Sequence, residues 1–547
     1  MKHLLPRDRA RRSLNGRPDD GGSGQMRDRS RIAVAIVMAL YVVWAAAFIR
    51  VSSVSMPDGT RAYCLFDDAM ISMRYAENVV RGRGPVWNEG ERVEGYTNPL
   101  MVAVMAAFLL VLPKAWAVLG IQLLGIALML GTALLCLRIY DRISHPPLRA
   151  PPWLVMAAVL AIYTLSFWSL LGMETGLIAL LTACAAATAV SRDDTDRRIG
   201  LIAWLTGLLY LCRPDALLIG LTLGAPLVLS TTSRRFRSAS RLLLPCITIA
   251  AAHLAFRLAY YGELLPNTFT LKLADVPLRV RLHDGGVFLG PFLEGIIPLV
   301  GLALYGMAHT PSRSRLMLAA PMAGLVLYQW YVGGEPWAYW RIMGPALPLM
   351  AALACDGATL LAARALPTPT QVRVTALVIA AMAWAMAIHN KPFLTEALLL
   401  TPFQEAVLNR DRVLAGYALR EVTGPAATVA VVGAGAIPFY AERRGVDMLG
   451  KCDRDIARLK PDLSGSVSWY GMTTIPGHNK YDLYRSIVER KPTYVETPRW
   501  GRQDLTAWVR QRYVQVTYNG ARLWLLRGSP DVRWEMLRGP SGAVMGE

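Results

Sequence analysis

Residues 66–100 read FDDAMISMRYAENVVRGRGPVWNEGERVEGYTNPL, a polar passage in a chain that is otherwise strongly apolar. The passage opens with two adjacent carboxylates, Asp67 and Asp68, which follow the first apolar segment. Carboxylates on the outer face of a membrane protein are available to take a proton from a bound substrate. The pair therefore favours an enzyme over a pore.

A structural role for the two aspartates competes with this interpretation. Residues 69–81 have helical character, and an Asp just before a helix satisfies its free N–H groups. The two roles are compatible, because Asp68 can cap the helix while Asp67 points into a cavity. Adjacent carboxylates also raise one another's pKa, which improves either of them as a base.

The composition places most of the chain in a membrane. Of the 547 residues, 54% are hydrophobic and 18% are charged, and the mean hydropathy is +0.33. Apolar runs near the length of a bilayer crossing recur as far as residue 389. The first, 32–49, is long for a cleavable signal and predicts a membrane anchor. Residues 1–31 before it are rich in Arg, Asp and Gly and predict a disordered, basic cytoplasmic tail.

The net charge of +19 has a topological explanation. Arginines gather beside the apolar segments, for example at Arg138 and Arg142 and again at Arg234 and Arg235, as the positive-inside bias requires. A nucleic-acid-binding protein would gather its Lys and Arg on one soluble face, with aromatic residues between them. We therefore expect the lipid bilayer as a partner, and no nucleic acid.

Residues 98–112 decide the number of crossings. These fifteen apolar-rich residues would form a helix of roughly 22 Å, which falls short of the roughly 30 Å hydrocarbon core. If this helix lies along the outer interface instead, every Arg-rich loop becomes cytoplasmic. The prediction is an α-helical polytopic domain over 32–390, with about eleven crossings, a cytoplasmic N-terminus and a first outer loop at 50–116.

Residues 391–547 predict a small α/β domain on the outer face. Strand-like runs such as ATVAVVGA (427–434) alternate with helical segments, and Asn519-Gly520 signals a hairpin. The stretch VVGAGAIP (431–438) resembles a dinucleotide-binding motif but has Pro438 in place of the third glycine, so we expect no such cofactor.

The cysteines offer a disulfide but no zinc site. Cys64 and Cys452 fall in segments that we expect to face outward, where a bond between them is possible. No spacing of Cys and His resembles a set of zinc ligands.

Polar side chains from separate outer segments complete the candidate site. Arg341 either anchors a span end in the interface or binds a lipid-linked phosphate through its planar guanidinium, and Lys272 is a second candidate for that phosphate. His478 either contacts an acceptor or closes a turn. The remaining substrate-binding candidates are Arg74, Glu94, Tyr96, Asn98, Asn267, Glu335 and Asn479.

Several motifs together resemble one enzyme superfamily. Besides residues 67–100, they are GMETGL (172–177), CRPDAL (212–217), YYGELLPNTF (260–269), GGEPWAYWRIMGPALP (333–348), VDMLGKCDRDIAR (446–458) and PGHNKYD (476–482). In this order they are similar to polyprenyl-phosphate-dependent glycosyltransferases of the GT-C superfamily, above all to terminal arabinofuranosyltransferases of cell-wall arabinan.

The resemblance implies a GT-C fold with interfacial helices in the first loop and an extracytoplasmic C-terminal domain. It also implies that Asp67, at the first acid of the family's Asp-Asp or Asp-Glu motif, is the catalytic base. Two positions depart from the family pattern. Glu335 stands where relatives often have Asp, and Lys451-Cys452 replaces a more usual Leu-Asn. Both departures bear on the choice of acceptor.

The expected reaction moves a sugar from a polyprenyl-phosphate donor to a saccharide or glycoconjugate acceptor, outside a bacterial cytoplasmic (inner) membrane. Asp67 would accept the acceptor's proton during one inverting displacement, Asp68 would orient the acceptor or Asp67, and Arg341 with Lys272 would hold the departing phosphate. His478 and Asn479 would help to bind the acceptor. Some GT-C enzymes use a divalent metal, which these residues neither demand nor exclude.

The sugar, the acceptor and one alternative class stay open. Arabinofuranose leads, followed by mannose and 4-amino-arabinose, and the acceptor is arabinan, lipopolysaccharide or a glycoprotein. A secondary transporter or lipid-carrier flippase is the alternative, although it would place ionisable residues near the bilayer midplane.

Overall fold

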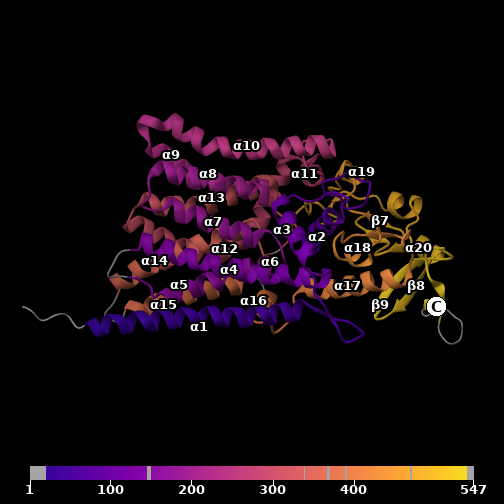
Figure 1. Cartoon of the computed structure of the whole chain (residues 1–547), viewed down its shortest axis with the longest axis horizontal. Helices are drawn as coiled ribbons and strands as arrows, with labels where there is room; N and C mark the ends of the chain where they lie inside the picture. Colours follow the sequence, from indigo (N-terminus) through magenta and orange to yellow (C-terminus); the bar gives the residue numbers. More distant parts are fainter. Residues whose placement is uncertain are drawn as a thin grey trace, which may run out of the picture.

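A computed structural model describes residues 20–144, 149–337, 339–365, 370–388, 391–468 and 471–538. Long helices lie side by side along the longest axis of the molecule, and the larger sheet lies at one end of this bundle (Figure 1). The first-loop helices lie close to the same end. The architecture therefore brings the first loop and the C-terminal region together.

The bundle supplies several helices that are able to cross a membrane. Among the described residues, five are long and apolar enough, within 28–52, 114–143, 232–261, 278–309 and 344–364. A sixth candidate is the pair α5 (Pro152–Leu160) and α6 (Tyr163–Leu170), which bends by 59° at its break. The expected total of about eleven crossings counted shorter apolar helices as well, and it stays a prediction.

The bundle consists of these five long helices together with shorter ones. They are α1 (Asp20–Ser52), α4 (Lys114–Ile143), α7 (Thr175–Ala189), α8 (Thr195–Cys212), α9 (Leu217–Ser230), α10 (Arg235–Tyr261), α12 (Leu278–His309), α13 (Arg313–Val332), α14 (Leu347–Ala365), α15 (Thr370–Ile388) and α16 (Lys391–Ala397), with the single turns η1 (Pro214–Ala216), η2 (Thr232–Arg234) and η3 (Gly344–Ala346).

The outer helices present apolar side chains to their surroundings. On α1 the exposed residues include Ile32, Ile36, Leu40 and Val43, spaced as on one face of a helix. A continuous apolar face of this kind fits a lipid environment. Because α1 begins at Asp20, it includes the second part of the expected tail, and residues 1–19 lie outside the described residues.

The first loop contains two helices besides the small pair β1 (Val54–Ser55) and β2 (Arg61–Ala62). Helix α2 (Asp67–Val80) is buried along most of its length although it carries many polar residues, and both α3 and α18 pack against it. Helix α3 (Pro99–Val111) is the apolar segment that we expect to lie along the membrane surface. A buried polar helix requires partners for its side chains, and the C-terminal region supplies several of them.

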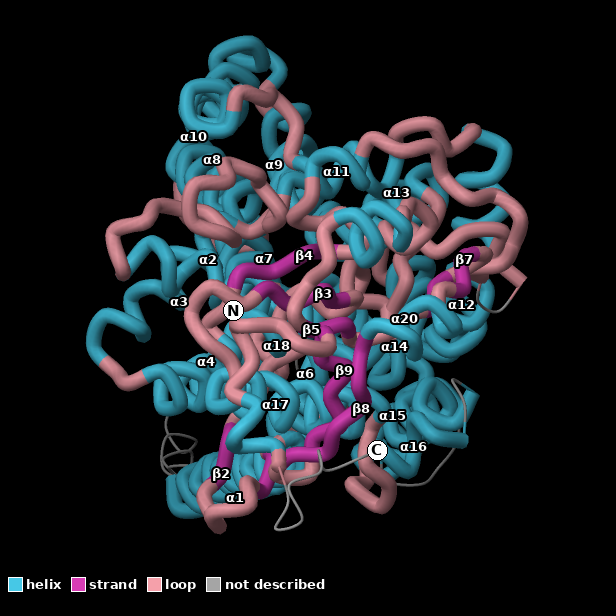
Figure 2. The backbone as a smooth tube through the Cα atoms, turned by 90° about the vertical axis from the view of Figure 1, so that its right-hand side faces the viewer, coloured by secondary structure: helices cyan, strands magenta, loops and turns pink. Residues whose placement is uncertain are grey.

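The C-terminal region forms a five-stranded mixed sheet in the order β4-β3-β5-β9-β8 (Figure 2). Strand β3 is parallel to β4 and β5, whereas β9 is antiparallel to β5 and β8. The predicted hairpin at Asn519-Gly520 is confirmed, since both residues have positive φ and join β8 to β9. The strands are β3 (Thr428–Val431), β4 (Arg444–Asp447), β5 (Tyr494–Val495), β8 (Tyr513–Tyr518) and β9 (Ala521–Leu526), and a separate pair is β6 (Arg499–Trp500) and β7 (Gln503–Asp504).

Short helices join this sheet to the first loop and the bundle. Helix α18 (Ala436–Ala441) packs on α2, and α19 (Arg454–Ala457) packs on α11 (Asn267–Leu273). The other helices of the region are α17 (Gln404–Val422), α20 (Thr506–Arg512), the π-helix η4 (Tyr484–Glu489) and the 3₁₀ helix η5 (Trp534–Leu537). The contacts of α18 and α19 place the loops of the C-terminal region over the ends of the bundle helices.

Candidate active site

A cavity of about 570 Å³ lies where the first loop, the bundle and the C-terminal region meet. Asp68 contributes from α2, Arg341 from the segment before α14, and Lys451 from the loop between β4 and α19. The apolar part of its lining includes Leu217, Leu218, Leu254, Leu265, Phe269 and Val332. The cavity therefore presents charged groups and an apolar wall to the same ligand.

Asp68 is the member of the tandem pair that faces this cavity. Its carboxylate forms an ion pair with the Lys451 ammonium and lies 3.5 Å from Nη1 of Arg341. Burial raises the pKa of Asp68, but the cations Lys451 and Arg341 outweigh burial and hold this pKa well below its usual range. Asp68 is thus a charged carboxylate with two cationic neighbours.

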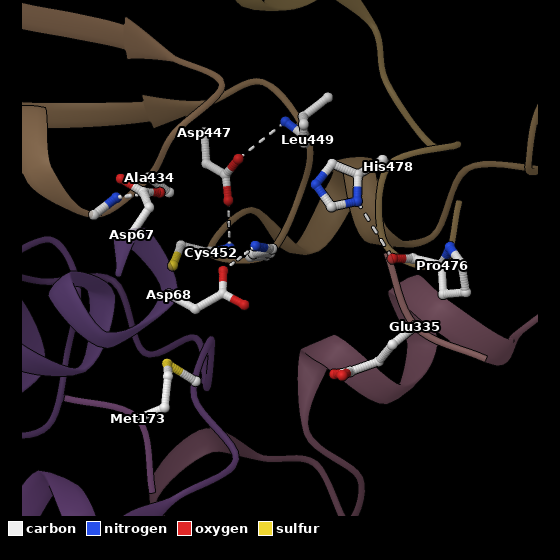
Figure 3. A network of polar contacts seen from close by, with 12 residues as sticks. Asp67, Asp68, Met173, Glu335, Ala434, Asp447, Leu449, Cys452, Pro476 and His478 are labelled. Carbon is white, nitrogen blue, oxygen red and sulfur yellow. Dashed lines mark hydrogen bonds and ion pairs between the residues drawn. The ribbon is translucent and has the colours of Figure 1, made fainter. Parts of the chain in front are cut away.

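Asp67 turns instead toward the C-terminal region (Figure 3). Its carboxylate accepts hydrogen bonds from the backbone N–H groups of Gly435 (3.2 Å) and Ala436 (3.0 Å) at the start of α18, and it lies 3.6 Å from Nη1 of Arg412. It does not line the cavity, and the N-cap of α2 is Phe66, without a side-chain cap. The expectation that Asp67 enters the cavity while Asp68 caps α2 is therefore wrong: Asp68 lines the cavity, and Asp67 binds the start of α18.

The glycine-rich stretch VVGAGAIP explains this arrangement. Its backbone N–H groups bind two carboxylates: Val432 and Gly433 donate to Glu496 at 2.6 and 3.0 Å, and Gly435 and Ala436 donate to Asp67. A Cβ on Gly435 would collide with the backbone carbonyl oxygen of Asp67, so only glycine permits this approach. The stretch is an anion-binding loop whose N–H groups bind carboxylate side chains of the protein itself.

Arg341 and Lys272 share the cavity wall with Asp68. The guanidinium of Arg341 pairs with buried Glu335, with Nε at 3.1 Å from Oε1, and lies over the ring of Trp168. Among the described residues, the Lys272 ammonium has no partner within hydrogen-bonding or ion-pairing distance. Burial lowers the pKa of Lys272 to about 8, although Glu335 opposes this effect. An anion entering the cavity would find in Lys272 a cation that is free to bind it.

Three of the substrate-binding candidates also line the cavity: Glu335, Tyr96 and Asn98. Tyr96 and Asn98 lie in its wall, where Asn98 donates to Glu174 at 2.9 Å. Glu174 in turn lies 3.3 Å from Nη1 of Arg213, which also lines the cavity. These groups extend the polar side of the site away from Asp68.

The first-loop candidates Arg74 and Glu94 lie outside the lining and make internal contacts. Arg74 donates to the carbonyls of Trp87 and Arg443, which ties α2 to the rest of the first loop and to the residue just before β4. Glu94 pairs with Arg257 at 2.8 Å. Their expected roles in substrate binding stay predictions.

The candidates Asn267, His478 and Asn479 also lie outside the lining. Asn267 donates to backbone carbonyls of the loop that carries Lys451. Asn479 accepts from the Ile475 N–H and so closes its own turn. The His478 ring is buried beside aromatic rings, and burial, reinforced by nearby Lys451, lowers its pKa to about 3.

Lys451 lines the cavity, although it was not among the site residues expected from the sequence. One signal in the sequence was its departure from the family pattern. Cys452 beside it and Cys64 are both buried and free, so the possible disulfide is absent from the described residues. Within those residues no three His, Cys, Asp or Glu side chains are placed to hold a metal ion.

The arrangement of helices is similar to that of ArnT, a solved structure with the GT-C fold. The structure of ArnT from Cupriavidus metallidurans bound to undecaprenyl phosphate matches with a TM-score of 0.52 over 81% of this chain and 89% of that chain, at 14% identity. At this identity the match shows the fold alone. It supports the helical GT-C fold expected from the sequence motifs, whereas the number of crossings and the outer C-terminal domain stay predictions.

Two curated relatives are both called terminal beta-(1->2)-arabinofuranosyltransferase. The one from Mycobacterium tuberculosis is 28% identical over 46% of this chain and 43% of its own length. The one from Corynebacterium glutamicum is 30% identical over 38% of this chain and 33% of its own length. The chain thus matches less than half the length of either relative. Residues 404–534 also match a family described as a domain of unknown function (DUF8728).

Proposed function

We propose that this chain is a membrane glycosyltransferase that moves a sugar from a polyprenyl-phosphate donor to a saccharide acceptor. The observation that carries the proposal is the cavity, in which cations and a carboxylate face one another beside an apolar wall. A lipid-linked phosphate complements this lining, because its anionic head suits the cations and its apolar tail suits the apolar wall. The names of the two curated relatives and the ligand of the ArnT structure support the same class of reaction.

The reaction needs a base and an anion site, and the cavity contains candidates for both. The acceptor hydroxyl oxygen attacks the anomeric carbon and forms the new C–O bond, while the bond to the donor phosphate oxygen breaks. The electron pair of that bond leaves with the polyprenyl phosphate, and the hydroxyl proton passes to a carboxylate. Arg341 and Lys272 stabilise the charge on the departing phosphate.

Within the tandem pair, we assign the proton to Asp68. A general base must approach the reacting hydroxyl to hydrogen-bond distance, and Asp68 lines the cavity. Asp67 binds the C-terminal region through α18 and so holds the cavity wall in place. This division differs from the role that the family resemblance gives to Asp67, and single substitutions separate the two assignments.

The finer parts of the proposal rest on the relatives and on the sequence. The leading donor sugar is arabinofuranose, as the names of both relatives suggest. The polar end of the bundle would face the outer side of a bacterial cytoplasmic membrane, with the C-terminal sheet region outside and the N-terminus inside. The arginine distribution along the sequence supports that orientation.

The proposal is tested by identifying the lipid that the protein retains. The Asp68→Asn variant, which binds the donor but lacks the base, should co-purify with a polyprenyl-phosphate sugar that mass spectrometry identifies directly. An Asp68→Asn/Arg341→Met double variant should retain much less of it, because the phosphate contact is lost. Recovery of only membrane phospholipid from both proteins would refute a polyprenyl-phosphate donor.

A further inference from the structure

Lys451 reaches the cavity from the C-terminal region and pairs there with Asp68. The two residues are 383 positions apart in the chain. Asp68 comes from the first loop, so the contact joins two units that fold from distant parts of the sequence. The ion pair also occupies the carboxylate to which the proposed reaction assigns the proton.

The loop that carries Lys451 is fixed on both of its sides. Asp447 accepts hydrogen bonds from the N–H groups of Leu449 (2.9 Å) and Cys452 (2.6 Å) (Figure 3). Asn267 of α11 donates to the carbonyls of Gly450 at 2.8 Å and of Lys451 at 2.9 Å. The backbone of Lys451 is therefore fixed, while its four-carbon side chain retains the freedom to change partner.

Two other cations of the cavity, Arg341 and Lys272, differ in whether they already have an ion-pair partner. Arg341 is paired with Glu335, and Lys272 has no bonding partner among the described residues. An entering phosphate therefore meets Lys272 first and must compete with carboxylates for Arg341 and Lys451. A phosphate monoester or diester offers more acceptor oxygens than one carboxylate oxygen, so it competes well for an ammonium.

We propose that Lys451 changes partner when the donor binds: it leaves Asp68 for the donor phosphate and thereby frees this carboxylate to accept the hydroxyl proton. Lys451 then has two roles: it binds the donor phosphate, and until the donor is in place it prevents Asp68 from acting as a base. The inference rests on the proposed function, since it takes the cavity as the donor site. The inference also gives a role to Lys451, a residue that departs from the family pattern.

Binding of undecaprenyl phosphate to the full chain in nanodiscs tests the exchange without any need for activity. Lys451→Met should weaken binding about tenfold, the loss expected for one charge-assisted hydrogen bond. Asp68→Asn should tighten binding severalfold, because the competing anion is removed. Undecaprenol, which lacks the phosphate, should bind all variants equally.

A double-mutant comparison identifies the exchange itself. If Asp68 weakens phosphate binding by holding Lys451, the gain from Asp68→Asn should disappear once Lys451 is Met. Lys451→Arg should restore most of the affinity that Lys451→Met loses, since the charge is kept. Lys460→Met, an exposed lysine of the same region, is the matched control and should bind like the unmodified protein.

The outcomes separate this inference from the proposed function. If Arg341→Met and Lys272→Met lose affinity while Lys451→Met does not, the exchange is refuted and the donor site stands. An equal gain from Asp68→Asn with Lys or Met at 451 also refutes the exchange, because repulsion alone then explains that gain. If none of the three cation variants alters binding, the cavity is not the phosphate site and both proposals fail.

Discussion

Replacing Asp67 by Asn should loosen the C-terminal region from the first loop, whereas the same change at Asp68 should stop catalysis. The two aspartates are neighbours on α2, yet the first binds N–H groups at the start of α18 and the second lines the cavity. The pair of substitutions therefore tests whether anchoring and proton transfer are divided between them.

The size of the first effect follows from the bonds that Asp67 makes. An Asn side chain keeps one oxygen as an acceptor, but its NH₂ group faces the second N–H donor and its charge is lost to Arg412. Bonds to charged groups contribute about 1.5–3 kcal/mol each, so a loss of about 2–4 kcal/mol is expected. That loss raises the equilibrium constant for opening of the contact roughly 30- to 1,000-fold.

Two measurements distinguish the variants: amide hydrogen exchange and the rate of sugar transfer. In Asp67→Asn the amides of Gly435 and Ala436 should lose protection, because their acceptor is weakened. In Asp68→Asn the same amides should stay protected while kcat falls about 10²- to 10⁴-fold, the usual effect of removing a general base. Asp58→Asn, an exposed aspartate of the same loop, is the control and should change neither quantity.

One combination of results would overturn the division. If Asp67→Asn abolished transfer with full amide protection while Asp68→Asn remained active, Asp67 would be the base, as the family resemblance implies.

Three further effects follow from the same contacts. Gly435→Ala should lower the stability by about 2 kcal/mol or more, seen as a lower Tm, because its methyl group meets the backbone of Asp67; an unchanged Tm would contradict the close approach. Burial, partly opposed by a nearby arginine, raises the pKa of Glu405 to about 7, so folding favours its protonated form; stability should fall as pH rises from about 4.5 to about 7, and Glu405→Gln should flatten this slope. Arg341→Lys should raise the donor KM about tenfold or more with a smaller change in kcat, because one ammonium cannot bind both Glu335 and a phosphate as the guanidinium can; an unchanged KM would remove Arg341 from the donor site.

The local sequence predicted the elements but not their orientation. Asn519-Gly520 specified its hairpin because two positive φ angles are a local requirement. Successive residues of a helix point about 100° apart, so only one of two adjacent aspartates can face a given cavity. Which one does so is decided here by the N–H groups of Gly435 and Ala436, 368 and 369 positions along the chain from Asp67. A long-range contact of that kind leaves no local pattern.

The polar residues that we expected at the site fall into two groups in the structure. Arg341 and Lys272 were expected at a common site, and both line the cavity. Asn267, His478 and Asn479 were expected beside them, but their side chains satisfy nearby backbone groups or pack among aromatic rings. Polar residues in loops perform both tasks, and only the packed structure distinguishes them.

The ion pair between Asp68 and Lys451 has a consequence for biosynthesis. A ribosome that adds about 5–20 residues per second needs roughly 20 to 80 seconds to cover the 383 positions between them. During that interval α2 has neither the anion-binding loop nor the lysine beside it, and its buried polar side chains lack their partners. A chain arrested before the β4–α19 loop would therefore carry an incomplete cavity, however well its earlier helices had inserted.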